Sequence, residues 1–380
     1  MHIISLALDP KVLDKESVVA FRTKAYGSIV DHYTVIVPSP STMTVYLSDR
    51  ATIYGIGGKW RVIQLFKMYR KVTTLIHEKK CNVITSQDMY FLGLLGLFFA
   101  RKYHLGLEVQ VLGIEKLTHL RKVLATFVLK RASVVRALSH RLEKRLISEF
   151  NIPSKKIRVV PIYVDVNKLG LDVRTLTGKD AEEFRGHSEK FRTLYGKRFN
   201  FLTVSRLVPI KRIEFQLRAL RALIDENYNV LLHIVGAGPD ETKLKQMVTE
   251  LKLTEHVVFH GYQSGRTLGM FYIECDCFLL TSDYEGWGMV IVEALSAGLP
   301  IIMTDVGCAG ELVIHEKSGL VVPPLNLEGI TNAMKRIVKE NNLRETVSVG
   351  GMHALATLPD FETVLKAYRE NWEVALTHKV

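Results

Sequence analysis

The stretch EGWGMVIVEALSAGLP, residues 285–300, places two glutamates, Glu285 and Glu293, around a pair of glycines. Gly286 and Gly288 would let the backbone N–H groups at the start of a helix approach a ligand closely. A helix start has N–H groups without intrahelical partners and the positive end of the helix dipole, so it suits an anion such as phosphate. The two carboxylates suit sugar hydroxyls, because a carboxylate accepts several hydrogen bonds. The alternative is that Glu285 only assists the helix start and Glu293 is a solvated helix residue.

The flanks of this stretch indicate a parallel sheet. Short apolar runs predict buried strands at 277–280 and 300–303, with a turn and a helix between them. The same alternation runs through the second half of the chain: strands are expected at 199–205, 230–236, 256–261 and 319–324, and helices at 211–226, 240–252 and 265–274. It predicts a doubly wound sheet, which binds ligands at the carboxyl ends of its strands.

The first half of the chain alternates in a similar way and predicts a second sheet. Strands are expected at 2–8, 33–38, 81–86, 107–112, 134–138 and 157–162, and helical segments at 59–80, 89–103, 117–131 and 140–150. The glycines in GIGG, residues 55–58, indicate a plain turn before the helical segment at 59–80, with a role on the acceptor side as the alternative.

These patterns predict an α/β protein with two Rossmann-like domains, each a doubly wound parallel sheet, facing a central cleft. The first domain is expected over residues 1–165 and the second over 199–360, with a polar linker and lead-in over 166–198. A C-terminal helix over about 361–380 is expected to pack back on the first domain.

Charge is distributed unevenly along the chain. Residues 1–200 hold 34 Lys and Arg against 17 Asp and Glu, whereas residues 201–380 hold 17 against 22. A basic half can face nucleic acid or an anionic membrane, but no nucleic-acid-binding motif accompanies it. We therefore predict an anionic membrane surface as a partner, reached through the basic segments at 59–80 and 117–131. A solvated basic face is the alternative.

Cysteines and hydropathy point to the cytoplasm. The four cysteines, Cys81, Cys275, Cys277 and Cys308, form no disulfide framework and are expected to be reduced and close to the core. The start of the chain has no signal-peptide pattern. The most apolar stretch, residues 89–100, is too short to span a bilayer, which needs about 20 residues. We expect a cytoplasmic protein that can lie at the inner face of the cell membrane.

Four motifs in series resemble glycosyltransferase family 4, the retaining transferases of GT-B fold that use nucleotide sugars. The match is close over about 199–325. SRLVPIKR (205–212) resembles the family's Arg…Lys motif, and VGAGPD (235–240) its Gly-rich turn. The two-glutamate signature corresponds to 285–311, and KSGLVVPP (317–324) completes the order.

This resemblance implies a role for each matching residue. Arg206 and Lys211 would hold the donor diphosphate, together with the helix start at Gly286, Trp287, Gly288 and Met289. Glu285 would bind hydroxyls of the donor hexose and Glu293 those of the ribose. Gly236 and Gly238 would belong to the donor site. Tyr262 would line the base pocket, with core packing as the alternative.

The chain departs from the family in its first half. The strand at 107–112 ends in Leu112 before Gly113, where many relatives have a histidine near the donor sugar. His119 lies seven residues downstream and is more typical of a surface residue. Asp88, at the carboxyl end of a strand, is better placed to contact or deprotonate the acceptor. Capping of the helix at 89–103 is the alternative role for Asp88.

The resemblance predicts a retaining hexosyltransferase, with front-face departure of the donor's leaving group. The basic first half and the segments at 59–80 and 117–131 indicate a lipid-linked saccharide or a polysaccharide as the acceptor. Uridine is the favoured base and guanosine the alternative. The chain has no Asp-x-Asp pattern, so we expect no metal and no other cofactor. A nucleotide-sugar epimerase and a non-catalytic nucleotide-sugar-binding protein remain alternatives, the latter because of Leu112.

Overall fold

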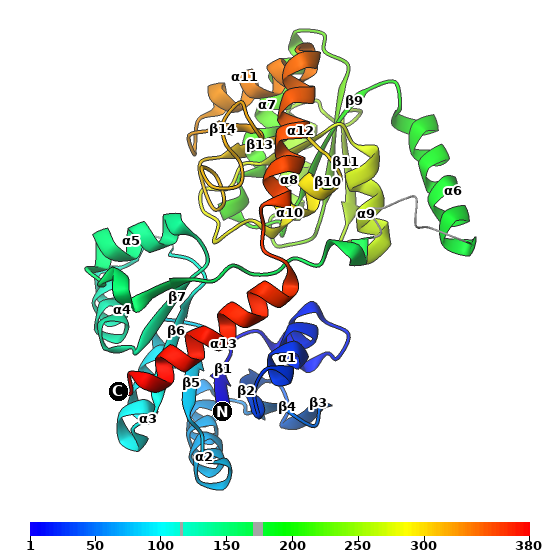
Figure 1. Ribbon diagram of the computed structural model, residues 1–380. Coiled ribbons are helices and arrows are strands. Elements are labelled where there is room, and N and C mark those ends of the chain that lie inside the picture. The colour runs from blue at the N-terminus through cyan, green and yellow to red at the C-terminus, as the bar shows by residue number, and fades with distance from the viewer. Residues whose placement is uncertain (115–116, 170–177) are drawn as a thin grey trace. The chain divides into compact units, whose positions relative to one another are not determined.

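The computed structural model describes residues 1–114, 117–169 and 178–380, with the backbone alone for 61, 62, 168, 178–181 and 183–185. The chain divides into two compact units (Figure 1). Unit 1 comprises Met1–Tyr163 and Pro359–Val380, and unit 2 comprises Val164–Leu358. Unit 2 thus begins at Val164, before the segment expected as linker.

Unit 1 is built on an eight-stranded sheet of order β3-β4-β2-β1-β5-β6-β7-β8. Its strands are β1 (His2–Leu6), β2 (His32–Ser39), β3 (Met43–Ser48), β4 (Ala51–Gly57), β5 (Val83–Ser86), β6 (Gly106–Val111), β7 (Val134–Ala137) and β8 (Ile157–Val159). Its helices are α1 (Val18–Ser28), α2 (Arg61–Lys79), α3 (Phe91–Tyr103), α4 (His119–Arg131), α5 (His140–Phe150) and α13 (Phe361–Thr377), with short 3₁₀ turns η1 (Pro10–Leu13) and η2 (Ser154–Lys156).

One hairpin in unit 1 was not expected from the sequence. β3 pairs antiparallel with β4, and every other pairing in this sheet is parallel. The turn predicted at 55–58 is wrong, because Gly55 and Gly57 lie in β4, next to β2. A Cβ at Gly57 would lie 2.4 Å from the backbone nitrogen of Thr42. The glycine thus marks a close approach of two backbones inside a sheet, where a side chain has no room.

Unit 2 is built on a six-stranded, wholly parallel sheet of order β11-β10-β9-β12-β13-β14. Its strands are β9 (Phe199–Val204), β10 (Val230–Val235), β11 (Val257–Gly261), β12 (Cys277–Leu280), β13 (Ile301–Thr304) and β14 (Leu320–Val322). Its helices are α6 (Gly178–Tyr195), α7 (Ile213–Asp225), α8 (Glu241–Glu250), α9 (Gly265–Glu274), α10 (Met289–Ser296), α11 (Leu327–Lys339) and α12 (Asn341–Ala356), with 3₁₀ turns η3 (Val166–Leu169) and η5 (Pro209–Lys211).

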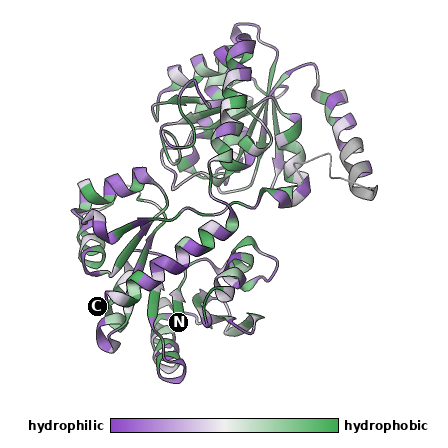
Figure 2. Ribbon diagram, viewed as in Figure 1, coloured by the Kyte–Doolittle hydropathy of each residue, from purple (hydrophilic) through white to green (hydrophobic). Residues whose placement is uncertain are grey.

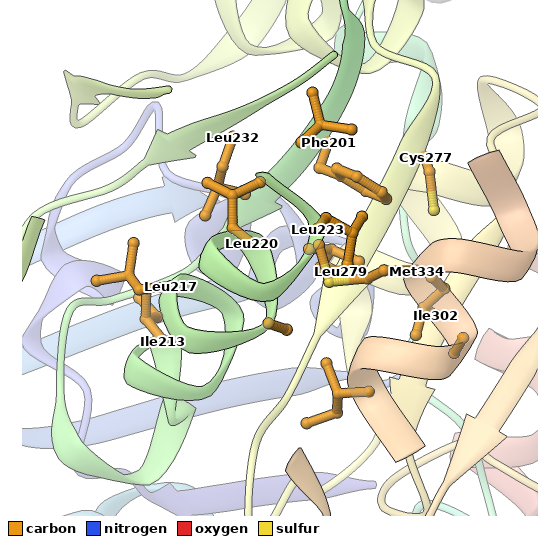
Figure 3. Packing of buried hydrophobic residues seen from close by; sticks show 14 of the residues in the cluster. Phe201, Ile213, Leu217, Leu220, Leu223, Leu232, Cys277, Leu279, Ile302 and Met334 are labelled. Atoms are coloured by element: carbon orange, nitrogen blue, oxygen red, sulfur yellow. The ribbon is translucent and has the colours of Figure 1, made fainter. Parts of the chain in front are cut away.

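The core of unit 2 explains why its strands read as unbroken apolar runs. Leu217, Leu220 and Leu223 of α7 pack on Phe201 and Leu232 of the sheet, and all five side chains are fully buried (Figure 3). A sheet covered by helices on both faces buries both sides of each strand, so alternation is lost. The two predicted doubly wound sheets are therefore confirmed. All four cysteines are buried free thiols.

The C-terminal helix α13 joins unit 1 through a buried carboxylate. Hydrophilic and hydrophobic residues alternate along it (Figure 2), and its apolar side carries Trp372, which is fully buried. The Trp372 indole N–H donates to Glu108 Oε2 at 3.0 Å, and the Asn371 amide donates to Glu108 Oε1. Thr85 Oγ1 also donates to Glu108 Oε2, at 2.5 Å. Glu108 therefore links α13 to β5 and β6.

Replacing Glu108 by alanine should destabilise unit 1 strongly. The change leaves several buried donors without an acceptor, and such a loss typically costs about 3 kcal/mol or more. Thermal denaturation measures the effect. Glu373→Ala removes a carboxylate on α13 that is about half exposed and pairs with Arg369, so it should cost less than about 1 kcal/mol. Equal melting shifts for the two variants would contradict the role given to Glu108.

Candidate functional site

Three loops of unit 2 meet at one edge of its sheet. β10, β9 and β12 are neighbours and run parallel, so the segments that follow them leave from the same edge. These segments are 236–240, 205–212 and 281–288. The sheet order thus brings together motifs that lie up to about eighty residues apart in the chain.

The central contact of this site joins Lys211 to Glu285. The Lys211 ammonium donates to Glu285 Oε1 at 2.6 Å, and Ser282 Oγ donates to the same oxygen at 2.7 Å. The two charged side chains are 16% and 13% exposed, so water screens the pair less than it would at a surface. The structure therefore places the predicted cation and the predicted hydroxyl acceptor in direct contact.

Several further bonds hold the two loops together. Arg212 adopts a left-handed conformation, with a φ of 50°, and its Nε donates to Asp283 Oδ2 at 2.6 Å. The backbone N–H of Asp283 donates to the carbonyl of Ile210 at 2.9 Å, and Thr281 Oγ1 donates to the carbonyl of Lys211 at 3.0 Å. Sequence reasoning missed Ser282 and Asp283, although a polar TSD run directly after a buried strand could have indicated them.

Gly236 and Gly238 pack backbone against backbone. A Cβ at Gly236 would lie 1.8 Å from the carbonyl oxygen of Ser205, and one at Gly238 would lie 2.3 Å from that of Leu207. The Leu207 N–H donates to the carbonyl of Ala237 at 3.0 Å. The glycines thus allow the segment around Arg206 to lie against the turn after β10. Their observed role is to position this segment, and direct donor contact stays a prediction.

Arg206 itself is exposed at this edge. Among the residues that the structure describes, no carboxylate lies within 4.0 Å of its guanidinium. A guanidinium without a carboxylate partner at a rim of backbone loops is suited to bind a phosphate in a bidentate manner.

The start of α10 lies in the third loop. Gly288 precedes the helix with a φ of 90°, a left-handed conformation that glycine adopts without strain. Trp287 is only 8% exposed, and its carbonyl accepts from the Cys308 N–H at 2.9 Å. Trp287 therefore fixes the loop by packing. Gly286 precedes Trp287, and α10 begins at Met289. The Ile291 N–H donates to the carbonyl of Gly288 at 2.9 Å, so the N–H groups of Met289 and Val290 are the ones that suit an anion at this helix start.

Glu293 is not the solvated helix residue of the alternative interpretation. Its Oε2 accepts from the Tyr272 hydroxyl at 2.7 Å, and Tyr272 is fully buried. Burial raises the pKa of Glu293 above its ordinary value, and the hydrogen bond from Tyr272 opposes this shift. The hydroxyl therefore orients a partly desolvated carboxylate. Its contact with a ribose stays a prediction.

Two further predicted residues have contrasting surroundings. Tyr262 is 71% exposed, so the alternative that it packs in the core is wrong. Asp88, in unit 1, has its Oδ1 2.6 Å from the Tyr90 N–H and 3.4 Å from the Gly93 N–H. Burial raises the pKa of Asp88, and these backbone bonds oppose the shift. The structure thus shows the capping role, and catalysis by Asp88 stays a prediction.

Replacing Glu293 by glutamine should raise the thermal stability of the ligand-free protein at about pH 7.5. Because the pKa of Glu293 is raised in the folded state, its buried charge lowers the stability once the pH rises through that pKa. Below the unfolded-state pKa of about 4.3 the carboxyl is protonated in both states, so this cost is absent. Glutamine keeps an acceptor for Tyr272 and removes the charge.

Melting curves at about pH 7.5 and pH 4 test this. Glu293→Gln should melt higher than wild type at the higher pH, and the gap should shrink at the lower pH. Glu250→Gln, on the exposed side of α8, serves as the control and should shift the melting temperature less. A Glu293→Gln protein that melts below wild type at pH 7.5 would refute this account of the carboxylate.

Within the described residues, no group of three or more His, Cys, Asp or Glu side chains is arranged to hold a metal ion. Likewise, no described helix is both long and apolar enough to cross a membrane.

Comparisons with known proteins show similarity in sequence and in fold. Residues 185–351 match the family described as glycosyl transferases group 1. The chain is 30% identical over 235 residues to an uncharacterized glycosyltransferase of Methanocaldococcus jannaschii, covering 61% of this chain and 57% of that protein. It is also 30% identical over 231 residues to a GDP-mannose-dependent α-(1-6)-phosphatidylinositol monomannoside mannosyltransferase of Mycolicibacterium smegmatis, covering 58% and 57%.

The fold resembles that of solved glycosyltransferases. The crystal structure of Anabaena HepE in complex with UDP superposes with a TM-score of 0.76 at 20% identity, over 97% of this chain and 99% of that one. The two parallel-sheet units and this superposition together show a GT-B fold. Residues 185–351 are thus similar to the group 1 glycosyltransferases. The chain spans a little over half the length of the two curated relatives above.

Proposed function

We propose that this protein is a retaining glycosyltransferase that moves a hexosyl group from a nucleoside-diphosphate sugar to an acceptor hydroxyl. The observation that carries the proposal is the Lys211–Glu285 contact, with exposed Arg206 on the same loop and the start of α10 on the facing loop. Cations and backbone donors at one edge suit a diphosphate, and the carboxylates beside them suit sugar rings.

In this proposal the cations act on the leaving group. As the bond between the anomeric carbon and the phosphate oxygen breaks, negative charge grows on the diphosphate. Lys211 and Arg206 would stabilise this charge from fixed positions, which lowers the barrier without reorganisation of solvent. Glu285 is already held by Lys211 and Ser282, so it is oriented to accept hexose hydroxyls. Departure and attack on the same face would retain the configuration.

The base and the donor are proposed with the help of the relatives. HepE was crystallised with UDP, whereas the mycobacterial enzyme is named as GDP-mannose-dependent. We favour uridine for this chain. Tyr262 is proposed to contact the base, because its ring is exposed at the end of β11.

Lys211→Met should weaken UDP binding by about tenfold to a hundredfold. The change removes a charge-assisted hydrogen bond worth about 1.5–3 kcal/mol and leaves Glu285 as an unneutralised anion beside the diphosphate. Isothermal calorimetry with UDP measures the change. Lys243→Met, an exposed lysine on α8, is the matched control and should leave the affinity unchanged.

Turnover is tested separately from binding. Incubation with UDP-hexose and no acceptor should release free hexose slowly, and an epimerised nucleotide sugar would instead favour the epimerase. Leu112, 38% exposed in unit 1, stands where many relatives have histidine. Tight UDP binding without hydrolysis or transfer would therefore favour the non-catalytic alternative. Unchanged UDP affinity in Lys211→Met would overturn the proposed donor site.

We further propose that unit 1 binds an anionic membrane and that the acceptor is a lipid-linked saccharide or a polysaccharide. α2, α3 and α4 pack side by side: the Tyr69 ring of α2 lies 5.2 Å from the Phe99 ring of α3, and a Cβ at Gly93 of α3 would touch Val128 of α4. These helices and the residue before α2 expose large apolar side chains, including Trp60, Phe66, Phe91, Phe98 and Leu120.

Basic side chains lie among these apolar ones. Lys102 lies over the rings of Tyr69 and Phe98, and the Arg131 guanidinium lies 3.8 Å from the Phe127 ring centre. A surface of aromatic residues with adjacent cations suits the interface of an anionic bilayer, where each cation near the surface contributes about 1 kcal/mol.

Vesicle flotation tests the membrane proposal. The protein should float at low salt with vesicles of phosphatidylcholine containing about one quarter phosphatidylglycerol, and less with phosphatidylcholine alone. Phe66→Ser with Phe91→Ser should reduce flotation. Tyr46→Ser, which changes an exposed ring on β3, should not. Failure to bind anionic vesicles at low salt would rule the membrane surface out.

A further inference from the structure

A pocket of about 160 Å³ opens in unit 1. Its walls come from the segment after β1, from α1, from the ends of β6 and β7, and from α13. Polar side chains lining it include Arg22, Arg136, Gln110 and Asp9, with Tyr368 and Leu112 among the apolar ones. Pockets that enclose a whole drug-sized ligand measure about 300–1,000 Å³, so this one has room for a single small group.

Arg136 brings a buried positive charge to this pocket. Its side chain is 1% exposed, and its Nε and one Nη donate to the carbonyl of Val160 at 3.0 Å and to Gln110 Oε1 at 3.2 Å. Its guanidinium carbon lies 4.2 Å from the centre of the Tyr368 ring. Within the described part of the chain, no carboxylate lies within 4.0 Å of it.

The Glu108 carboxylate compensates the positive charge of Arg136 only through an intervening amide. The Gln110 amide donates to Glu108 Oε2 at 3.1 Å, so one amide separates the buried cation from the buried carboxylate. A buried charge that is bonded only to neutral dipoles keeps much of its desolvation cost. Arg136 therefore favours an anion in the pocket that it lines.

Arg22 adds a second cation. It is half-buried on α1, and its Nε donates weakly, at 3.4 Å, to the carbonyl of Val18 in its own helix. Across the described residues, it too has no carboxylate within 4.0 Å. Asp9 is exposed and is the acidic residue in the lining, so the lining carries two positive charges against one negative.

We propose that this pocket binds the carboxylate or phosphate group of an acidic saccharide acceptor. A guanidinium offers a fork of donors that matches either group, and two of them facing one small pocket would select an acidic acceptor over a neutral one. The exposed carboxylate of Asp9 is placed to accept hydroxyls of the same ligand. The assignment to the acceptor rests on the proposed glycosyltransferase function, whereas the preference for an acid rests on unit 1 alone.

The test uses the whole chain and three probes: glucuronate, glucose 6-phosphate and neutral glucose. Saturation-transfer NMR titrations, with and without UDP, give the affinity for each. Glucuronate or glucose 6-phosphate should bind about tenfold more tightly than glucose, or tighter still. The acid that binds more tightly of the two shows whether the pocket prefers a carboxylate or a phosphate. Arg22→Gln should remove most of the difference between that acid and glucose. Lys24→Gln makes the same charge change at an exposed site on α1 and should retain it.

Arg22 is the residue to change because Arg136 also bonds the carbonyl after β8 and supports the fold. Equal affinity for glucose and both acids, or an equal loss in Arg22→Gln and Lys24→Gln, overturns the pocket proposal. Arg22-dependent binding of an acid by a protein that does not bind UDP would support the pocket and count against the donor site, so the two failures are distinguishable.

Discussion

One ion pair joins the two loops at the sheet edge of unit 2: the Lys211 ammonium lies 2.6 Å from the Glu285 carboxylate. Lys211 ends the short 3₁₀ turn η5, and Glu285 lies on the loop before α10, so bonds between the two segments are needed to fix them. The Arg212–Asp283 pair, the Thr281 hydroxyl and the bond from Asp283 to Ile210 fasten these two loops to each other. The parallel sheet places β9 beside β12, so a single edge of the sheet holds the Lys211 ammonium and the Glu285 carboxylate side by side.

Unit 1 contains a buried hydrogen-bond network that includes two charged side chains. Glu108 and Arg136 lie on neighbouring strands and are both almost fully buried, yet they interact through the Gln110 amide. The carboxylate side of this network fastens α13 to the sheet, and the guanidinium side lines a pocket. The same network therefore holds the chain's last helix on the sheet and brings a positive charge to the pocket.

Much of the architecture was predictable because both sheets are mostly parallel. Such strands are short unbroken apolar runs, and the bounds expected for β12 and α9 match the structure residue for residue. The β3–β4 hairpin was not predicted, because glycines such as Gly55 and Gly57 are typical of a turn. The structure shows instead that the backbone at Thr42 lies too close to Gly57 for a side chain there. The four motifs gave the positions of Lys211 and Glu285. Sequence spacing could not reveal that the Tyr272 hydroxyl orients Glu293, since Tyr272 lies on α9 and Glu293 on α10.

The most direct measurement of the central claim is a crystal structure of the full chain with a UDP-hexose. The account predicts that the diphosphate lies against Lys211, Arg206 and the first N–H groups of α10, with Glu285 on the hexose and Glu293 on the ribose. A nucleotide sugar bound to any other surface, with the Lys211–Glu285 loops empty, would contradict it.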